Sequence, residues 1–177
     1  MTSIISDFDG VHTPNTAWID EAGNEWAEVN RSDGLGVQSW VEHGNGFLII
    51  SKERKDFAIK RAEKLSVQCL SGVDDKIGEI KKLSLDKYLP HQTIYIGNDI
   101  NDIPAMQFIG LSACVFDSHE EVLQIADVVT SREGGRGAVR ELIDIIEYSK
   151  KGICFRCFWH LERESIAVSE RNPPVQP

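Results

Sequence analysis

The sequence contains no long hydrophobic run. No stretch of its 177 residues approaches the roughly 18 to 20 consecutive apolar residues that a membrane span needs. The apolar run after Met1 is too short for the core of a secretion signal, and no basic stretch precedes it. We therefore expect no membrane segment and a cytoplasmic location.

Positive charge is also scarce. The chain has 19 lysines and arginines against 28 aspartates and glutamates, which gives a formal net charge of -9. This balance argues against general affinity for nucleic acid, whose binding depends on basic surface. A protein of this charge that acts on an anionic substrate must gather its few cations at one place or use a metal ion.

Cysteine is rare as well, with four residues in the chain. Cys69 and Cys114 stand in apolar segments, so we expect buried, reduced thiols. Cys154 and Cys157 have CxxC spacing, with His160 three residues on. No strand–CxxC–helix context and no second pair of ligands accompany them, so a redox or zinc role is the weaker interpretation.

What the sequence does contain is a regular alternation of short apolar runs and amphipathic segments. We predict strands at residues 2–8, 46–51, 67–70, 93–97, 111–116 and 126–129. Helices are predicted at 34–43, around 58–65, from 75, through 106, from 118 and over 139–146. This alternation predicts an α/β fold with a doubly wound parallel sheet in three αβα layers. We expect one domain over residues 1–150.

Two segments break the alternation. Residues 16–30 are predicted to form a β-hairpin that turns at 21–24 and carries Trp18 and Trp26. A hairpin this apolar either folds back on its own domain or packs on another surface. The tail over 151–177 ends Pro-rich and polar, and we expect at least its last ten residues to be disordered.

Paired carboxylates follow the first predicted strand. Asp7 and Asp9 in "IISDFDGVHT" point to the same side of an extended chain, whereas Phe8 points to the other. Two like charges stay ionised together only if something positive lies between them, and a divalent cation is the natural candidate. Ser51 and Asn98 also come at or just past strand ends, where ligands bind in such sheets.

Four motifs in order carry a resemblance to a known family. "DFDGVHT", "IIS", the lysine of "GVDDKIGEI" and "IGNDIND" resemble the motifs of the haloacid dehalogenase superfamily of phosphohydrolases. "NRSDGLGV", "RAEKL" and "GGRGAVRE" are similar to segments of its uncapped sugar-acid phosphatases, which act on 3-deoxy-octulosonate 8-phosphate or nonulosonate 9-phosphates. They look most like the phosphatase-like domain often fused to acylneuraminate cytidylyltransferases.

The resemblance implies a role for each motif residue. Asp7 would be the nucleophile that becomes an aspartyl-phosphate, and Asp9 the general acid and base. Ser51 and Lys76 would hold the phosphoryl group. The cofactor would be Mg²⁺, bound by Asp7, by the backbone carbonyl of Asp9 and by the last motif. In that motif the family has an aspartate where this chain has Asn98, which lowers metal affinity unless Asp99 or Asp102 compensates.

Several residues, most of them near the second motif, are candidates for binding the substrate. Glu53 matches the residue found in the nine-carbon group of the family. Its carboxylate can accept hydrogen bonds from a sugar hydroxyl or an acylamino group. Arg61 and Arg136 are candidates for the substrate carboxylate or for a subunit contact. Gly10 and Lys52 complete the set, although a solvated helix face is the simpler interpretation for most lysines of this stretch.

Three hypotheses remain open. The first is an Mg²⁺-dependent phosphatase of a sugar-acid phosphate, which the resemblance implies is a homotetramer whose hairpins close neighbouring sites. The second is a non-catalytic oligomerisation module that associates with a cytidylyltransferase. The third, a response-regulator-like receiver, is disfavoured by the paired "DFDG" carboxylates and by the hairpin after them.

Overall fold

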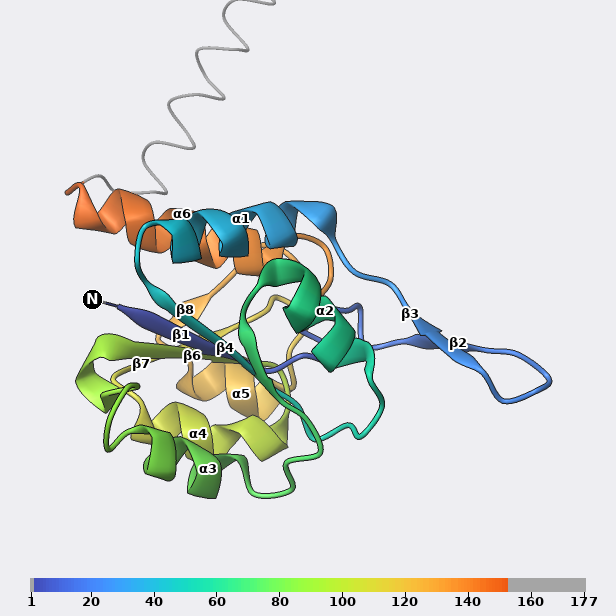
Figure 1. Cartoon of the computed structure of the whole chain (residues 1–177). Coiled ribbons are helices and arrows are strands. Elements are labelled where there is room, and N and C mark those ends of the chain that lie inside the picture. The colour runs from blue at the N-terminus through green and yellow to red at the C-terminus, as the bar shows by residue number, and fades with distance from the viewer. Residues whose placement is uncertain (1, 153–177) are drawn as a thin grey trace, which may run out of the picture. The chain divides into compact units, whose positions relative to one another are not determined.

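The computed structural model describes residues 2–152 of the chain (Figure 1). Contacts divide the chain into two compact units, Met1–Leu142 and Ile143–Pro177. The expected domain boundary at residue 150 stays a prediction. The expected disorder of the tail and the CxxC pair lie outside the described residues.

The first unit contains a parallel sheet of six strands. They are β1 (Ser3–Ser6), β4 (Gly46–Ile50), β5 (Gln68–Leu70), β6 (Thr93–Gly97), β7 (Leu111–Cys114) and β8 (Val128–Val129). Their order is β5-β4-β1-β6-β7-β8, so β1 lies between β4 and β6. Each strand coincides with a predicted apolar run, and the predicted parallel sheet is confirmed.

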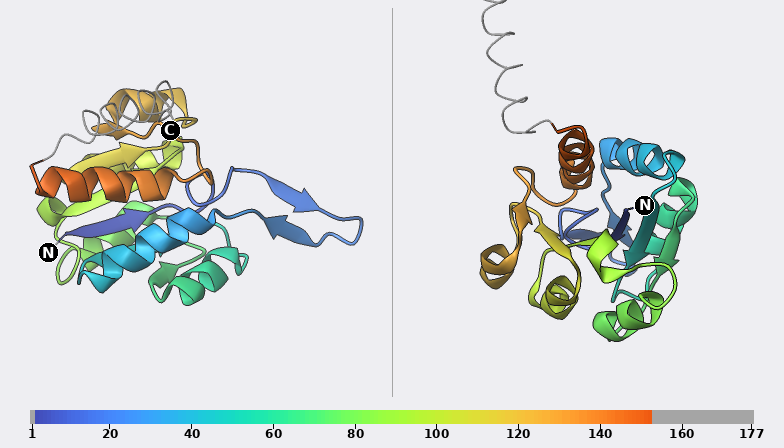
Figure 2. Two further views of the ribbon diagram at one scale, coloured as in Figure 1. Left: turned by 90° about the horizontal axis from the view of Figure 1, so that it is seen from above. Right: turned by 90° about the vertical axis from the view of Figure 1, so that its left-hand side faces the viewer.

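Helices cover both faces of this sheet. In the first unit they are α1 (Arg31–Glu42), α2 (Phe57–Leu65), α3 (Lys76–Leu83), α4 (Ile103–Phe108) and α5 (Glu120–Ile125), with 3-10 turns at Pro90–Gln92 and Ile100–Asp102. Helices α1 and α2 lie on one face and α3, α4 and α5 on the other (Figures 1 and 2). Helix α6 (Ala138–Lys150) crosses the boundary between the two units. The predicted αβα layers are confirmed, and the described residues include no cap domain.

The central strand explains why the sheet is buried on both sides. All four residues of β1 are buried, and Ile4 and Ile5 have no exposed surface. Such a continuous apolar run, rather than an alternating one, is typical of parallel strands covered by helices on both faces. The carboxyl ends of β1, β4 and β6 therefore meet at one edge, where the polar motif residues follow them.

The predicted hairpin forms from β2 (Ala17–Ile19) and β3 (Glu25–Ala27) and projects away from the sheet (Figure 2). Trp18 pairs with Trp26, and these side chains are 73% and 53% exposed. The hairpin thus does not bury its tryptophans on its own domain. The returning half of the hairpin is anchored by ion pairs of Glu25 with Lys55 and of Glu28 with Arg136.

The part of the chain that the structure describes, residues 2–152, has no helix both long and apolar enough to span a membrane.

Candidate active site

Asp7 follows β1 directly and is almost completely buried. Its backbone N–H donates to the carbonyl of Ile96 at 2.9 Å, which continues the β1–β6 pairing beyond the strand end. One carboxylate oxygen, Oδ1, accepts from Phe8 N at 2.8 Å and from Lys76 Nζ at 2.7 Å. Burial raises the pKa of Asp7 to about 7, and Asp102 adds to this while Lys76 opposes it. Its other oxygen, Oδ2, has no donor among the described residues.

The turn after Asp7 is shaped by Gly10, which has a positive φ of 77°. A Cβ at this position would lie 2.0 Å from Nδ2 of Asn98, so only glycine lets the two motifs approach so closely. The hydroxyl of Thr13 accepts from Gly10 N at 3.1 Å and closes the turn. Asp9 is held within this turn, and burial raises its pKa, although a hydrogen bond from Ser51 opposes the shift.

The glycine-rich segment supports the same turn from behind. A Cβ on Gly134 would lie 1.9 Å from the carbonyl oxygen of Gly10, and Gly135 N donates to Val11 O at 2.9 Å. Gly134 N is itself held by Asp117 Oδ1 at 2.8 Å. The backbone of the "GGRG" motif therefore packs against the Asp7–Asp9 turn and holds it in place.

Ser51 lies at the end of the neighbouring strand. It follows β4, has no exposed surface, and its Oγ donates to Asp9 Oδ2 over a long 3.4 Å. The same Oγ accepts from Glu53 N at 3.1 Å, which turns the chain sharply after the strand. The hydroxyl is thereby aimed at the Asp9 carboxylate.

Lys76 begins α3 and is the buried cation of the site. Its Nζ lies 2.7 Å from Asp7 Oδ1 and 2.8 Å from Asp102 Oδ1, and only 5% of the residue is exposed. Burial alone would lower the pKa of Lys76, but the two carboxylates outweigh burial and raise it. Lys76 therefore stays charged and offsets part of the repulsion between the acids.

Asp102 lies beneath the site and has no exposed surface. Its Oδ1 accepts from Lys76 and from the Tyr95 hydroxyl at 2.6 Å, and its Oδ2 accepts from Asn98 N at 2.9 Å and Asp99 N at 3.3 Å. Gly97 makes room for it, since a Cβ there would lie 2.5 Å from the Asp102 carboxylate. Both oxygens are taken by protein donors. Asp102 thus orients Lys76 and the last motif rather than facing the open side of the site.

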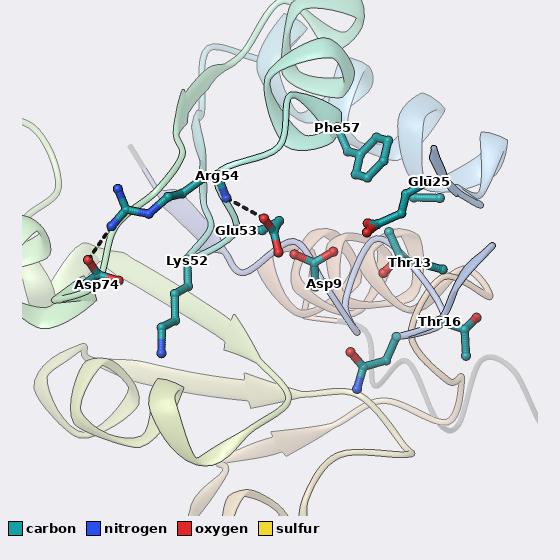
Figure 3. A pocket seen from close by; sticks show the side chains of 12 residues that line it. Asp9, Thr13, Thr16, Glu25, Lys52, Glu53, Arg54, Phe57 and Asp74 are labelled. Atoms are coloured by element: carbon teal, nitrogen blue, oxygen red, sulfur yellow. Dashed lines mark hydrogen bonds and ion pairs between the residues drawn. The ribbon is translucent and has the colours of Figure 1, made fainter. Parts of the chain in front are cut away.

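Two connected cavities open above these residues. The smaller one, which we call the catalytic pocket, has a volume of about 120 Å³ and is lined by Asp7, Asp9, Asn15, Lys52, Lys76, Asn98, Asp99 and Asn101. The larger one, which we call the outer pocket, has a volume of about 540 Å³ and lies against the hairpin (Figure 3). Asp9, Asn15 and Lys52 line both cavities, so a single ligand can extend from one into the other.

This arrangement agrees with the comparisons with known proteins. Residues 40–143 match the family model described as haloacid dehalogenase-like hydrolase. The chain is 35% identical over 145 residues to the 3-deoxy-D-manno-octulosonate 8-phosphate phosphatase KdsC of Yersinia pestis, covering 81% of this chain and 78% of that protein. The chain belongs to the haloacid dehalogenase-like hydrolase family. It is a phosphatase of that family, as the named relatives are.

Solved structures of the same family agree. The structure of the Yersinia pestis octulosonate phosphatase matches with a TM-score of 0.78 and 34% identity, covering 82% of this chain and 80% of that one. The Moraxella catarrhalis enzyme, described in complex with magnesium, phosphate and KDO, matches with a TM-score of 0.78 and 28% identity over 82% and 85% of the two chains. The fold and the family are therefore established together.

The haloacid dehalogenase-like site fits a divalent cation with oxygen ligands. The amide oxygen of Asn98 is buried and has no hydrogen-bond partner, beside the Asp7 and Asp9 carboxylates that line the same pocket. Within the described residues, no three His, Cys, Asp or Glu side chains are grouped to hold a metal. Asp7, Asp9 and Asn98 would therefore be the residues to hold Mg²⁺, with the Asp7 carboxylate as an anionic ligand and the Asn98 amide oxygen as a neutral one.

Asn98→Asp is expected to tighten Mg²⁺ binding on the order of tenfold, because an anionic ligand then replaces a neutral one. Calorimetric titration of the metal, without substrate, measures this directly. Asn101→Asp is the matched control, since it adds the same charge to the rim of the same pocket. Equal gains in both variants would show that charge, and not ligation by residue 98, sets the affinity.

The structure separates the predicted substrate residues into two groups. Lys52 and Glu53 line the outer pocket, and Gly10 lies in the turn beside it. Arg61 and Arg136 do not reach either pocket: Arg61 donates to the carbonyl of Asn30 at 2.8 Å, and Arg136 pairs with Glu28 at 2.5 Å. Their predicted part in binding the substrate carboxylate is not supported by where they lie.

Sequence reasoning missed several residues of the site. Tyr95 carries a hydroxyl in the middle of an apolar strand, which is a signal for a buried hydrogen bond, here to Asp102. Thr13 stands in the first motif, but nothing in the pattern says that it caps Gly10. Phe57 and Glu25 line the outer pocket from α2 and from the hairpin, and no local pattern connects these distant segments.

Proposed function

We propose that the chain is an Mg²⁺-dependent phosphatase of a sugar-acid phosphate, with a nonulosonate 9-phosphate or 3-deoxy-octulosonate 8-phosphate as substrate. One observation carries it: Asp7 and Asp9 converge with the buried Lys76 at the base of a pocket that widens into a second, larger one. The names of the Yersinia pestis and Moraxella catarrhalis relatives support the substrate class.

The reaction divides into two displacements at phosphorus. Asp7 attacks the phosphate, the bond from phosphorus to the sugar oxygen breaks, and Asp9 gives its proton to that oxygen. Asp9 then takes a proton from water, the water attacks the aspartyl-phosphate, and inorganic phosphate leaves while Asp7 is regenerated. The raised pKa of Asp9 suits this work, because the acid form must be present at the start.

The remaining residues stabilise charge. Lys76, held against Asp7, offsets the negative charge of the phosphoryl group, and Ser51 donates a hydrogen bond to it. Lys52 lines both pockets and has no carboxylate partner in the described part of the chain, so it can bind the phosphate or the substrate carboxylate. When bound, Mg²⁺ supplies further positive charge to the phosphoryl oxygens.

A panel of eight- and nine-carbon sugar-acid phosphates tests the proposal. Phosphate release is measured for each compound with Mg²⁺ and with excess EDTA, and turnover is expected only with the metal. Release that continues in EDTA would contradict the metal requirement. Absence of release from every member would favour the non-catalytic module. The neutral Asn98 at the metal site supports that alternative. Co-purification with an acylneuraminate cytidylyltransferase would then be the next measurement.

Glu53→Arg is expected to lower kcat/KM for nine-carbon substrates more than for eight-carbon ones, because it replaces an acceptor in the outer pocket by a cation. Glu53→Gln is the control, since it keeps the shape and one acceptor oxygen. Equal losses on both substrate lengths would show that Glu53 does not discriminate between the sugars.

The proposal includes a homotetramer in which the hairpin of one subunit closes the site of the next. Trp18 and Trp26 are exposed on a projecting hairpin, and water exclusion strengthens the charge interactions on which the chemistry depends. Light scattering in dilute solution measures the mass. A monomer with full activity would refute the shared site.

A further inference from the structure

The two sides of the outer pocket differ in polarity. Figure 3 shows Lys52, Arg54 and Asp74 on one side of Asp9 and Phe57 on the other. Arg54 is paired with Asp74 at 2.8 Å, so Lys52 is the cation of that side available to an anionic substrate. The opposite side presents the aromatic ring of Phe57 next to Glu25, whose carboxylate is paired with Lys55.

This second side forms an apolar wall, composed of Phe57, Ala17 and Ala27. Phe57 is the first residue of α2, and its half-buried ring lines the pocket. Ala17 and Ala27 are cross-strand partners in the hairpin and therefore share one of its faces. Because side chains alternate along each strand, Trp18 and Trp26 occupy the other face. The wall is thus made of one ring and two methyl groups.

A fixed hydrogen-bond acceptor lies beside Asp9, between the two sides. Glu53 Oε1 accepts from the backbone N–H of Arg54 at 2.8 Å and of Lys55 at 3.3 Å, so the turn after β4 holds the carboxylate in place. No donor among residues 2–152 binds Glu53 Oε2. This oxygen can accept from an N–H or O–H of a ligand in the outer pocket.

The position of the two pockets dictates how a substrate lies. A phosphate at Asp7 places the rest of the molecule in the outer pocket, because Asp9 and Lys52 line both cavities. There it meets an acceptor followed by an apolar wall. A sugar hydroxyl matches the acceptor alone, whereas a secondary amide with a methyl end matches both: its N–H donates to Glu53 and its methyl packs on Phe57.

We infer that this phosphatase selects sugar-acid phosphates that carry a small acylamino group, and that the apolar wall around Phe57 is the specificity determinant. The inference rests on the proposed function, because it names the substrate class of the same site.

The experiment uses two nine-carbon sugar-acid phosphates that differ at one position, acetamido in one and hydroxyl in the other. The wild-type enzyme is expected to prefer the acetamido compound in kcat/KM. Phe57→Ala is expected to lower kcat/KM for that compound about tenfold, the usual effect of one methyl contact in a pocket, and to change the hydroxyl compound less than about twofold. Phe57→Leu keeps an apolar wall and should retain most of the preference.

The second substrate is also the control for folding, since a damaged enzyme loses both activities. Leu85→Ala removes an exposed apolar side chain that lines neither pocket and should change neither value. Equal losses on both compounds in Phe57→Ala, or no preference in the wild type, would overturn the inference and leave the phosphatase function intact. No release from either compound or from the eight-carbon phosphate would overturn the proposed function itself.

Discussion

Asp7→Asn is expected to lower phosphate release on the order of 10⁴-fold or more, because the amide cannot form the aspartyl-phosphate. Single-turnover experiments with labelled substrate measure both the rate and the covalent intermediate. The wild type should transiently bind label in acid-quenched protein, and the variant should bind none. Asp99→Asn is the control, since Asp99 lines the same pocket but is exposed and only caps the following turn.

The same substitution should stabilise the metal-free protein at neutral pH. The pKa of Asp7 is about 7 in the folded state against 3.8 for an unperturbed aspartate, so the folded state binds more protons between these values. Stability therefore falls as the pH rises from about 4 to 7, and Asn at this position removes that loss. Thermal unfolding in EDTA should show Asp7→Asn melting on the order of 10 °C higher at pH 8, with no difference near pH 4. A difference independent of pH would refute the assignment to Asp7 ionisation.

Lys76→Met is expected to abolish turnover and to lower the free energy of unfolding of the metal-free protein by about 3 to 5 kcal/mol, as when one partner of a buried ion pair is lost. Lys76 contacts Asp7 and Asp102 at 2.7 and 2.8 Å, and methionine leaves both carboxylates without a cation. Urea denaturation in EDTA at pH 8 measures this free energy of unfolding, because Asp7 and Asp102 are then both charged in the unfolded state.

The matched control is Lys82→Met on the same helix. Lys82 pairs with Glu79 at 2.6 Å on the protein surface, where ion pairs contribute little, so a change below about 0.5 kcal/mol is expected. Lys76→Met combined with Asp102→Asn should recover part of the loss, since one of the two uncompensated charges is removed. Similar values for the Lys76 and Lys82 variants would show that the buried charges are compensated by some other means.

The fold could be predicted because each element has a local signal. The strands are continuous apolar runs, and the hairpin has two short apolar segments around a turn held by Asp20. The convergence of Asp7, Ser51 and Asn98 also followed from their positions, since the ends of parallel strands share one edge of the sheet. These predictions depend on backbone geometry alone.

The rest of the site depends on where long side chains point, and sequence carries little information about that. Asp102 stands four residues after Asn98, and only the 3-10 turn between them directs its carboxylate back under the strand. Arg61 and Arg136 have the right charge for a substrate carboxylate but find partners elsewhere in the fold. Which partner each of these side chains binds is decided by tertiary contacts rather than by the local sequence pattern.

The strict alternation of side chains in the hairpin limits which insertions and deletions the chain can tolerate. Ala17 and Ala27 face the outer pocket while Trp18 and Trp26 face away, and this division rests on strand parity alone. One residue added before Ala17 that shifted β2 by one step against its surroundings would turn an indole into the pocket and a methyl group out of it. Length changes in the stem should therefore occur in steps of two residues. The turn beyond Asp20, which lines neither pocket, is free to vary by single residues.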